Sequence, residues 1–237
     1  MKKLFSAALA LTIGLSTYAQ SPVDLKIKPE IGKPIVMNMI VKTDVEGPQN
    51  LIMDMNMKMD MKATAFENEL YTIDNTTKSI KVDINADMMT MSYNSEEEPA
   101  DEIGKALAEQ FSKIIDQTVT LKMDNKGNAV EVNLPDSFKE QGFDQSSFAN
   151  ITTALPEKAV SVGESWESTI DTEANPMLSK TVTTSTFTAD SADGYVINVV
   201  GKLFDKAGAE IGSMNGKYVL DKATCLSKSG EVTTSVE

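Results

Sequence analysis

The sequence of 237 residues contains no histidine and no arginine, and its only cysteine is Cys225. Without histidine, neither a Ser-His-Asp triad nor a Cys/His zinc site can form, and a single cysteine excludes a disulfide within the chain. The formal charge of −13 argues against nucleic-acid binding, because phosphates are neutralised by Lys and Arg. We therefore expect no catalytic residue, no metal-binding residue and no cofactor, and the sequence favours ligand binding or protein interaction.

The first 20 residues have the composition of a signal peptide. Lys2 and Lys3 give a positive start, Leu4 to Leu15 form an apolar run, and Ala19 ends a small-x-small cleavage site. The apolar run is about a dozen residues, whereas a membrane span needs roughly 20. We predict a signal peptide over residues 1–19, a periplasmic or secreted protein, and no transmembrane segment; the alternative is an N-terminal anchor helix. The mature chain has 20 basic and 35 acidic residues, a net charge of −15.

Methionine alternates with polar residues in the segment Leu51 to Lys62. Successive side chains of a strand point to opposite faces, so this pattern predicts a strand with one face of thioethers and one polar face. Pro34 to Val45 repeats the pattern, and the turn-forming residues 47–50 separate the two strands. The methionines in phase are Met37, Met39, Met53, Met55, Met57, Met59 and Met61.

Alternation with period 2 also predicts strands along the rest of residues 20–237, which we expect to form a single β-rich domain. Residues 74–77 (Asp-Asn-Thr-Thr) and 124–127 (Asp-Asn-Lys-Gly) are typical of turns. Cys225 falls in the apolar-polar pattern of the last strand, which indicates a buried structural thiol. The further strands predicted are Leu70 to Ile73, Ile80 to Ile84, Met89 to Tyr93, Thr118 to Met123, Ala129 to Asn133, Ser165 to Asp171, Ser179 to Thr188, Tyr195 to Phe204, Glu210 to Leu220 and Leu226 to Val236.

Two helical insertions are predicted, near residues 96–116 and 136–154. In the first, Ile103, Leu107, Phe111 and Ile114 recur at helical spacing and form one apolar stripe. Short turns between neighbouring strands favour local antiparallel pairing. The expected fold is mainly β (α+β): a large curved antiparallel sheet or half-barrel of about 11 to 13 strands, with one or two helices packed on its concave face. The alternative is two lobes, one from each β-rich half.

The segment from Pro156 to Trp166 reads PEKAVSVGESW. It resembles the P-x-K-x-V-x-V-G-[DE]-x-W motif of a family of uncharacterised secreted bacterial proteins of unknown function. The methionine-rich strands and residues 216–224 are similar to that family too, but Cys225 stands where the likeness leads us to expect glycine. The order of strands and helices resembles the half-barrel of periplasmic lipoprotein carriers (LolA-like). Neither resemblance implies a catalytic residue, and we expect Trp166 to be a structural anchor at the start of a strand.

Ten of the 14 methionines lie between Met37 and Met91, and three interpretations of them remain open. Methionine fills irregular gaps in cores, it forms deformable apolar surfaces, and its thioether selects Cu(I). We favour an exported, non-enzymatic protein that binds an apolar small molecule, lipid or apolar segment in a methionine-lined cavity or groove; another exported or outer-membrane protein is a second kind of partner. The alternatives are a Cu(I)-binding protein and an interaction protein with a filled core. The predicted lining residues are Met37, Met39, Met53, Met55, Met57, Met59 and Met61, with Phe111 and Ile114 on the covering helix.

Overall fold

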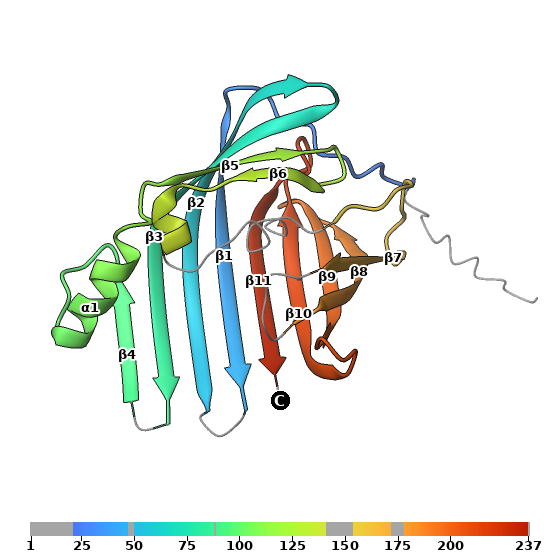
Figure 1. Cartoon of the computed structure of the whole chain (residues 1–237). Coiled ribbons are helices and arrows are strands. Elements are labelled where there is room, and N and C mark those ends of the chain that lie inside the picture. The colour runs from blue at the N-terminus through green and yellow to red at the C-terminus, as the bar shows by residue number, and fades with distance from the viewer. Residues whose placement is uncertain (1–20, 47–49, 88, 141–153, 172–177, 237) are drawn as a thin grey trace, which may run out of the picture.

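A single 11-stranded sheet, strongly curved and not closed into a barrel, forms the body of the protein (Figure 1). The computed structural model describes residues 21–46, 50–87, 89–140, 154–171 and 178–236. The order of strands across the sheet is β6-β5-β3-β2-β1-β11-β10-β9-β8-β7, and β4 pairs with β3. The predicted signal peptide, the turn at 47–49 and most of the second helical insertion lie outside the described residues.

The strands of the sheet are β1 (Pro34–Val45), β2 (Leu51–Glu67), β3 (Leu70–Ala86), β4 (Met89–Asn94), β5 (Thr118–Met123), β6 (Ala129–Asn133), β7 (Ser165–Asp171), β8 (Lys180–Asp190), β9 (Tyr195–Phe204), β10 (Glu210–Leu220) and β11 (Ser227–Val236). Most of their bounds agree with the period-2 pattern of the sequence, except that β2 extends to Glu67 and β3 joins two predicted strands, and the mainly β fold class is confirmed. The two β-rich halves form one sheet rather than two lobes.

The two halves of the chain meet where β1 pairs with β11, and this pairing is parallel. Every other pairing between the strands is antiparallel. The sheet is therefore two antiparallel meanders joined at one parallel seam, a correction to the uniformly antiparallel sheet that we expected. Local turn signals could not reveal the seam, because its strands are separated by almost the whole chain.

The turn predicted at residues 74–77 is wrong, because β3 runs unbroken through it. Its polar residues find partners within the sheet: Asp74 accepts a hydrogen bond from Thr120, and the hydroxyls of Thr76 and Thr118 lie 2.7 Å apart. At this point β3 changes its outer neighbour, from β5 along its first half to β4 along its second half. A register shift in the β2–β3 pairing accompanies the change.

Two short helices lie among the described residues, α1 (Glu102–Phe111) and α2 (Asp136–Glu140). The Asp101 side chain caps α1 by accepting a hydrogen bond from the backbone N–H of Gly104 at 2.6 Å. Helix α1 is shorter than predicted and packs at the β4 edge of the sheet, so Ile114 lies beyond its end. Among the described residues, no helix combines the length and the hydrophobicity needed to cross a bilayer.

Residues 21–33 form an extended segment that makes backbone hydrogen bonds with three loops at the upper end of the sheet in Figure 1. Val23 forms a β-bridge with Val160, the N–H of Ile27 donates to Asn125, and the N–H of Lys28 donates to Thr224. These contacts hold Leu25 and Ile27 in the core, where both are almost fully buried. The segment therefore fills the upper end of the curved sheet with apolar side chains.

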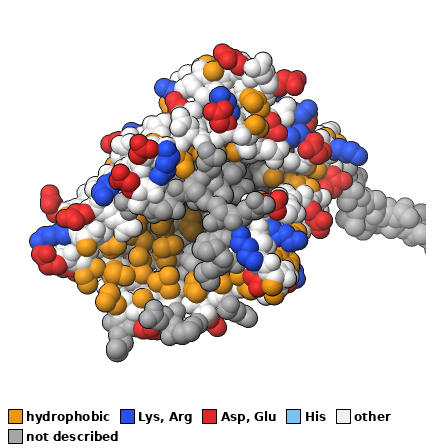
Figure 2. Space-filling view, viewed as in Figure 1, with side chains coloured by type: hydrophobic (Ala, Val, Ile, Leu, Met, Phe, Trp, Pro, Cys, Tyr) orange, Lys and Arg blue, Asp and Glu red, His pale blue; other side chains and the backbone are white. Residues whose placement is uncertain are grey.

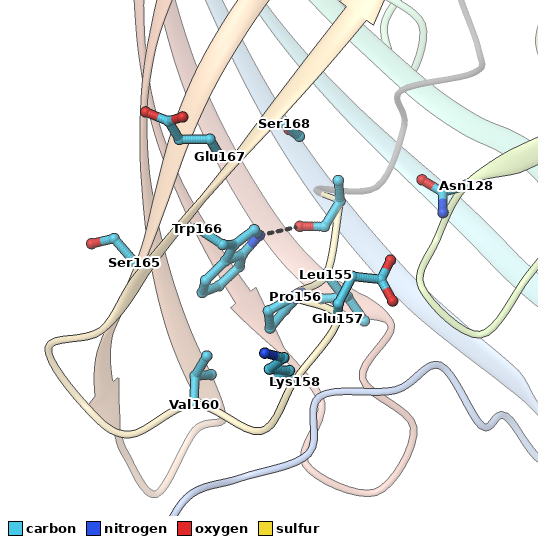
Figure 3. A pocket seen from close by; sticks show the side chains of 11 residues that line it. Asn128, Leu155, Pro156, Glu157, Lys158, Val160, Ser165, Trp166, Glu167 and Ser168 are labelled. Atoms are coloured by element: carbon cyan, nitrogen blue, oxygen red, sulfur yellow. Dashed lines mark hydrogen bonds between the residues drawn. The ribbon is translucent and has the colours of Figure 1, made fainter.

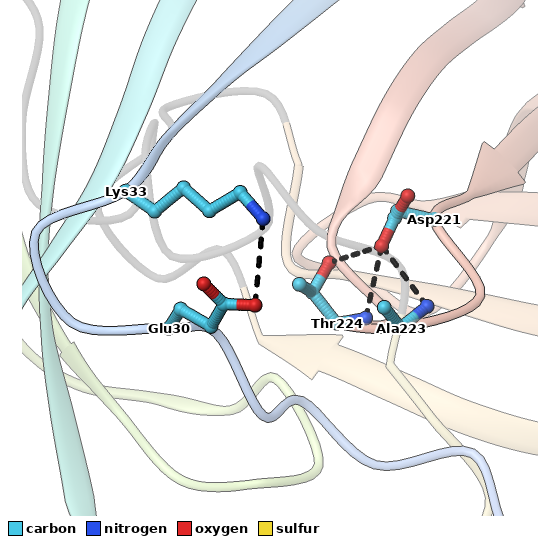
Figure 4. A network of polar contacts seen from close by, with 5 residues as sticks. All are labelled: Glu30, Lys33, Asp221, Ala223 and Thr224. Carbon is cyan, nitrogen blue, oxygen red and sulfur yellow. Dashed lines mark hydrogen bonds and ion pairs between the residues drawn. The ribbon is translucent and has the colours of Figure 1, made fainter.

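The turn between β10 and β11 is organised by Asp221 (Figure 4). One carboxylate oxygen of Asp221 accepts hydrogen bonds from the N–H of Ala223 and from the N–H and hydroxyl of Thr224, each at 3.0 Å. Cys225 lies in this turn, not in the strand pattern where we placed it, and has a φ of +54°. Glycine is the residue that adopts positive φ without strain, which explains why the family resemblance leads us to expect glycine at this position. The thiol is buried, as predicted, and burial raises its pKa.

Removing the Asp221 carboxylate should lower the free energy of unfolding by about 2 kcal/mol, because three donors lose one charged acceptor. We expect Asp221→Ala to show this loss in urea unfolding followed by circular dichroism. Glu30→Ala is the matched control: Glu30 pairs with Lys33 at 3.4 Å on an exposed surface, and such pairs contribute about 0.5 kcal/mol or less (Figure 4). Equal effects of the two substitutions would contradict the role assigned to Asp221.

Candidate functional site

The concave face of the sheet carries apolar side chains that gather over the lower parts of β1 to β4 (Figure 2). We call "lower" the end of the sheet at which Val45, Leu51, Ala86 and Val236 lie opposite one another. Directly opposed residues share a face of a sheet, so the strand register gives the composition of each row. The third row from the lower end reads Tyr93, Val82, Met55, Val41, Val232 and Gly216 from β4 to β10.

The seven predicted methionines share this concave face, but they divide into two groups. Met37, Met39, Met59 and Met61 lie in the upper part and are between 0% and 8% exposed. There they belong to one core cluster with side chains such as Leu25, Leu121 and Phe138. Met53, Met55 and Met57 are only half-buried; Met53 and Met55 lie in lower rows, and Met57 lies in the same row as Met39. The four buried methionines are therefore core residues, and the three half-buried ones, at the edge of the core, are available to line a binding surface.

The two residues predicted on the covering helix are also found near this face. Phe111 is the last residue of α1, and its ring stacks on that of Tyr93 with centroids 5.6 Å apart and an interplanar angle of 12°. Tyr93 lies opposite Val82, which lies opposite Met55. Ile114 is buried in the core. The helix thus borders the methionine rows at the β4 edge and does not cover their centre.

On the β11 side of the seam, the side chains of the concave face are smaller and many carry hydroxyl groups, which we did not predict. The row that contains Met53 continues through Thr43 and Thr234 to Met214. It then reaches Gly201, Thr183 and Ser168. The signal for this half was present in the sequence, because Gly212, Met214, Gly216 and Tyr218 alternate with polar residues along β10. Glycine at two of these four inward positions weakens the alternation, because glycine has no side chain to mark a face.

Tyr218 lies on the concave face at the boundary between the two halves. It is opposite Gly230 on β11 and Ile197 on β9. A Cβ at Gly230 would come within 3.0 Å of its ring, and a Cβ at Gly216 within 3.3 Å. The ring therefore lies across two glycines and leans along β10 toward the lower end. Burial raises the pKa of Tyr218 to about 12, so the hydroxyl is a neutral donor at physiological pH.

Alkaline pH should destabilise the protein through Tyr218. The pKa is raised by folding from 10.0 to about 12, so the stabilisation is complete below pH 10 and is lost as the pH rises toward 12. A shift of this size corresponds to a loss of about 3 kcal/mol in the free energy of unfolding. We expect Tyr218→Phe to remove this part of the dependence when urea unfolding of both proteins is compared at pH 9 and pH 12. Identical losses in both proteins would contradict it.

A hollow of about 370 Å³ lies beside the motif that ends at Trp166, and its lining includes Leu155, Pro156 and Val160 (Figure 3). The indole N–H donates to the carbonyl of Ala154 at 2.7 Å, which fixes the start of β7 against the preceding loop. Trp166 thus has the anchoring position that we predicted. The motif glycine, Gly163, has a φ of +94° and accommodates the turn before β7.

No group of three or more histidine, cysteine, aspartate or glutamate side chains within the described part of the chain is placed to hold a metal ion. Methionine sulfur atoms do come together, because the register sets Met37 opposite Met59 and Met39 opposite Met57. Side chains directly opposite one another on neighbouring strands have Cβ atoms about 5 Å apart. These four thioethers, which we call the thioether block, form a soft-ligand cluster on the described part of this face.

The fold and this face define a β-rich protein with a curved, unclosed sheet, whose described inward strand positions carry methionine and no charged side chain. The chain belongs to a family of unknown function, DUF6263, whose model matches residues 68–136 and 128–227. The match includes the motif ending at Trp166 and agrees with the resemblance to an uncharacterised family. Neither the curated proteins nor the solved structures contain a match to the chain.

Proposed function

We propose that this protein is exported and binds a lipid or acyl chain against the lower concave face, without catalysing a reaction. The observation that carries the proposal is that Met53, Met55 and Met57, which follow one another along β2, are half-buried beside exposed apolar surface (Figure 2). Thioether side chains are polarizable and have three rotatable bonds, so one surface can repack around different apolar guests. Each methylene group that leaves water contributes about 0.8 kcal/mol, so a long chain can bind with little polar recognition.

Two further points support export and carriage. Residues 1–19 have the pattern of a signal peptide, which would place the protein in the periplasm or outside the cell. The order of strands and helices resembles that of LolA-like lipoprotein carriers, and an unclosed β sheet with an apolar concave face supports carriage of an acyl chain by the same kind of surface. That likeness is an analogy of fold, so it raises the expectation of an acyl ligand without assigning one.

The uncharged fluorophore N-phenyl-1-naphthylamine tests the proposal directly. We expect the purified full chain to bind it with increased fluorescence, and native mass spectrometry to detect co-purified lipid. Met53→Gln combined with Met55→Gln should weaken binding of the fluorophore at least tenfold, because both side chains keep their length and become polar.

Ile52→Gln is the matched control, because Ile52 is 48% exposed on the opposite face of β2. This variant should bind the fluorophore as the unaltered protein does. The proposal fails if the unaltered protein binds neither lipid nor fluorophore. It also fails if the Gln substitutions on the two faces have the same effect. Displacement of the fluorophore by an apolar peptide but not by lipids would replace the acyl ligand with a peptide segment.

Cu(I) binding is a second candidate function, favoured by the thioether block of Met37, Met39, Met57 and Met59. Soft thioethers select Cu(I) over harder divalent ions, and the cross-strand register brings four of them onto adjacent rows. Competition with a chromogenic Cu(I) chelator tests this function. Met37→Leu with Met59→Leu should abolish sub-micromolar Cu(I) affinity and leave fluorophore binding intact, since leucine keeps the volume and removes the sulfur. Unchanged Cu(I) affinity in this variant would exclude the block as the site.

A further inference from the structure

The three lowest rows of the concave face contain no charged side chain. Their inward positions on β1 and β2 are Val41, Thr43, Val45, Leu51, Met53 and Met55. Across the seam the same rows hold aliphatic, glycine and hydroxyl residues, such as Val232, Gly216 and Thr183. The mature chain has a net charge of −15, so this lack of charge is not a general property of the surface.

The opposite face of the same strands carries charges at the alternate positions. Lys42 lies between Val41 and Thr43 and pairs with Glu231 at 3.1 Å. Asp54 lies between Met53 and Met55 and is opposite Lys42. The two faces of these strands therefore differ in charge: the outer face carries Lys and Asp or Glu side chains, and the three lowest concave rows carry none. A carboxylate or phosphate on the concave face would meet no cation there, and placing an unpaired charge in an apolar site is costly.

Tyr218 brings a polar group to the concave face beside the lower rows. Tyr218 is 7% exposed, and its hydroxyl makes no hydrogen bond with any part of the chain that the structure describes. The ring is largely buried, but the hydroxyl is not fully enclosed, so a carbonyl acceptor of a ligand can replace water as its partner. The ring packs against Gly216, whose missing side chain gives the ring room to lie there. A carbonyl oxygen is the neutral acceptor that suits a phenol donor.

We infer that the ligand of this face is an uncharged acyl lipid, an ester or amide whose carbonyl accepts a hydrogen bond from Tyr218 while its chain lies on Met53, Met55 and Met57. This inference rests on the proposed function and narrows it to one ligand class. It excludes free fatty acids and anionic phospholipids as preferred ligands, because their charged groups find no cation on the concave rows.

Displacement of N-phenyl-1-naphthylamine at pH 7.5 by methyl decanoate and by decanoate tests the inference. We expect the ester to displace the fluorophore at a concentration at least tenfold lower. Tyr218→Phe should weaken the ester about fivefold, the effect of one neutral hydrogen bond, and leave decanoate unchanged. Tyr195→Phe is the matched control: it removes a phenol at the start of β9, one row farther than Tyr218 from the lower end, where the ring packs edge-on against Phe187.

A gain of charge provides the converse test. Thr234→Lys places an ammonium group on the concave rows, and Thr233→Lys places one on the opposite face of the same strand. The first variant should raise the affinity for decanoate at least tenfold, and the second should not. If the fluorophore binds but the ester and the acid displace it equally from the unaltered protein, the inference is wrong while the proposed function stands. An unchanged ester affinity in Tyr218→Phe would also overturn it. Failure of the fluorophore to bind at all would instead refute the proposed function.

Discussion

Met37→Asp should leave the protein unfolded in the absence of denaturant, whereas Met53→Asp should leave it folded. Met37 is fully buried and lies opposite Met59 within the core cluster. A carboxylate there would be an unpaired charge in an apolar environment, which costs several kcal/mol even after relaxation. Domains of this kind have free energies of unfolding of about 5–15 kcal/mol, so the substitution removes much or all of the stability.

Met53 is half-buried on the same face, in the second row from the lower end of β2. An aspartate there keeps contact with water, so we expect a loss of about 1 kcal/mol in the free energy of unfolding and the loss of fluorophore binding. Urea unfolding followed by the fluorescence of Trp166 measures the first effect. Asn38→Asp, adjacent to Met37 but exposed on the opposite face, controls for the added charge. A folded Met37→Asp protein would show that the two groups of methionines are not distinct.

Val232→Pro is the second substitution for which a large effect is expected. Val232 lies in the middle of β11, opposite Val41 on β1 and Gly216 on β10. Proline removes a backbone donor and its ring disturbs the ladder, at a cost of about 3 kcal/mol or more in a regular element. The site matters further because β1 and β11 are the seam at which the two meanders join.

We expect Val232→Pro to unfold at a much lower urea concentration and to become susceptible to proteolysis in both meanders. Val232→Ile is the control, since it keeps the β-branched shape in a similar volume and should change the free energy of unfolding by about 1 kcal/mol or less. Limited proteolysis followed by mass spectrometry identifies the segments that are released. A proline variant as resistant as the unaltered protein would mean that the seam contributes little to the stability of the sheet.

Much of the local structure could be predicted because period-2 alternation is a local property. The bounds of Pro34–Val45, Thr118–Met123 and Tyr195–Phe204 match the predicted strands residue for residue. The failure at residues 74–77 has the same origin, because Asp, Asn and Thr favour turns only while their side chains satisfy local backbone groups. Here Thr118 and Thr120 of β5 supply partners for Thr76 and Asp74, and the strand continues.

The sequence predicted only part of the candidate site, because alternation along a strand shows which side chains share a face but not which of them are buried. Alternation placed all seven methionines on one face, but it could not separate Met37 and Met61 from Met53 and Met55. That separation depends on Leu25, Leu121 and Phe138, which reach the upper concave face from distant parts of the chain.

The sequence by itself determined which side chains share a face, because the alternation of strand side chains is set by backbone geometry over two residues. It also determined the absence of histidine chemistry and the acidic charge. Only the tertiary structure decided that β1 and β11 pair in parallel, that the methionines divide between core and surface, and that Tyr218 stands between an apolar half and a hydroxyl-rich half. These features arise from contacts between residues far apart in the chain, and no periodicity within a single strand encodes them.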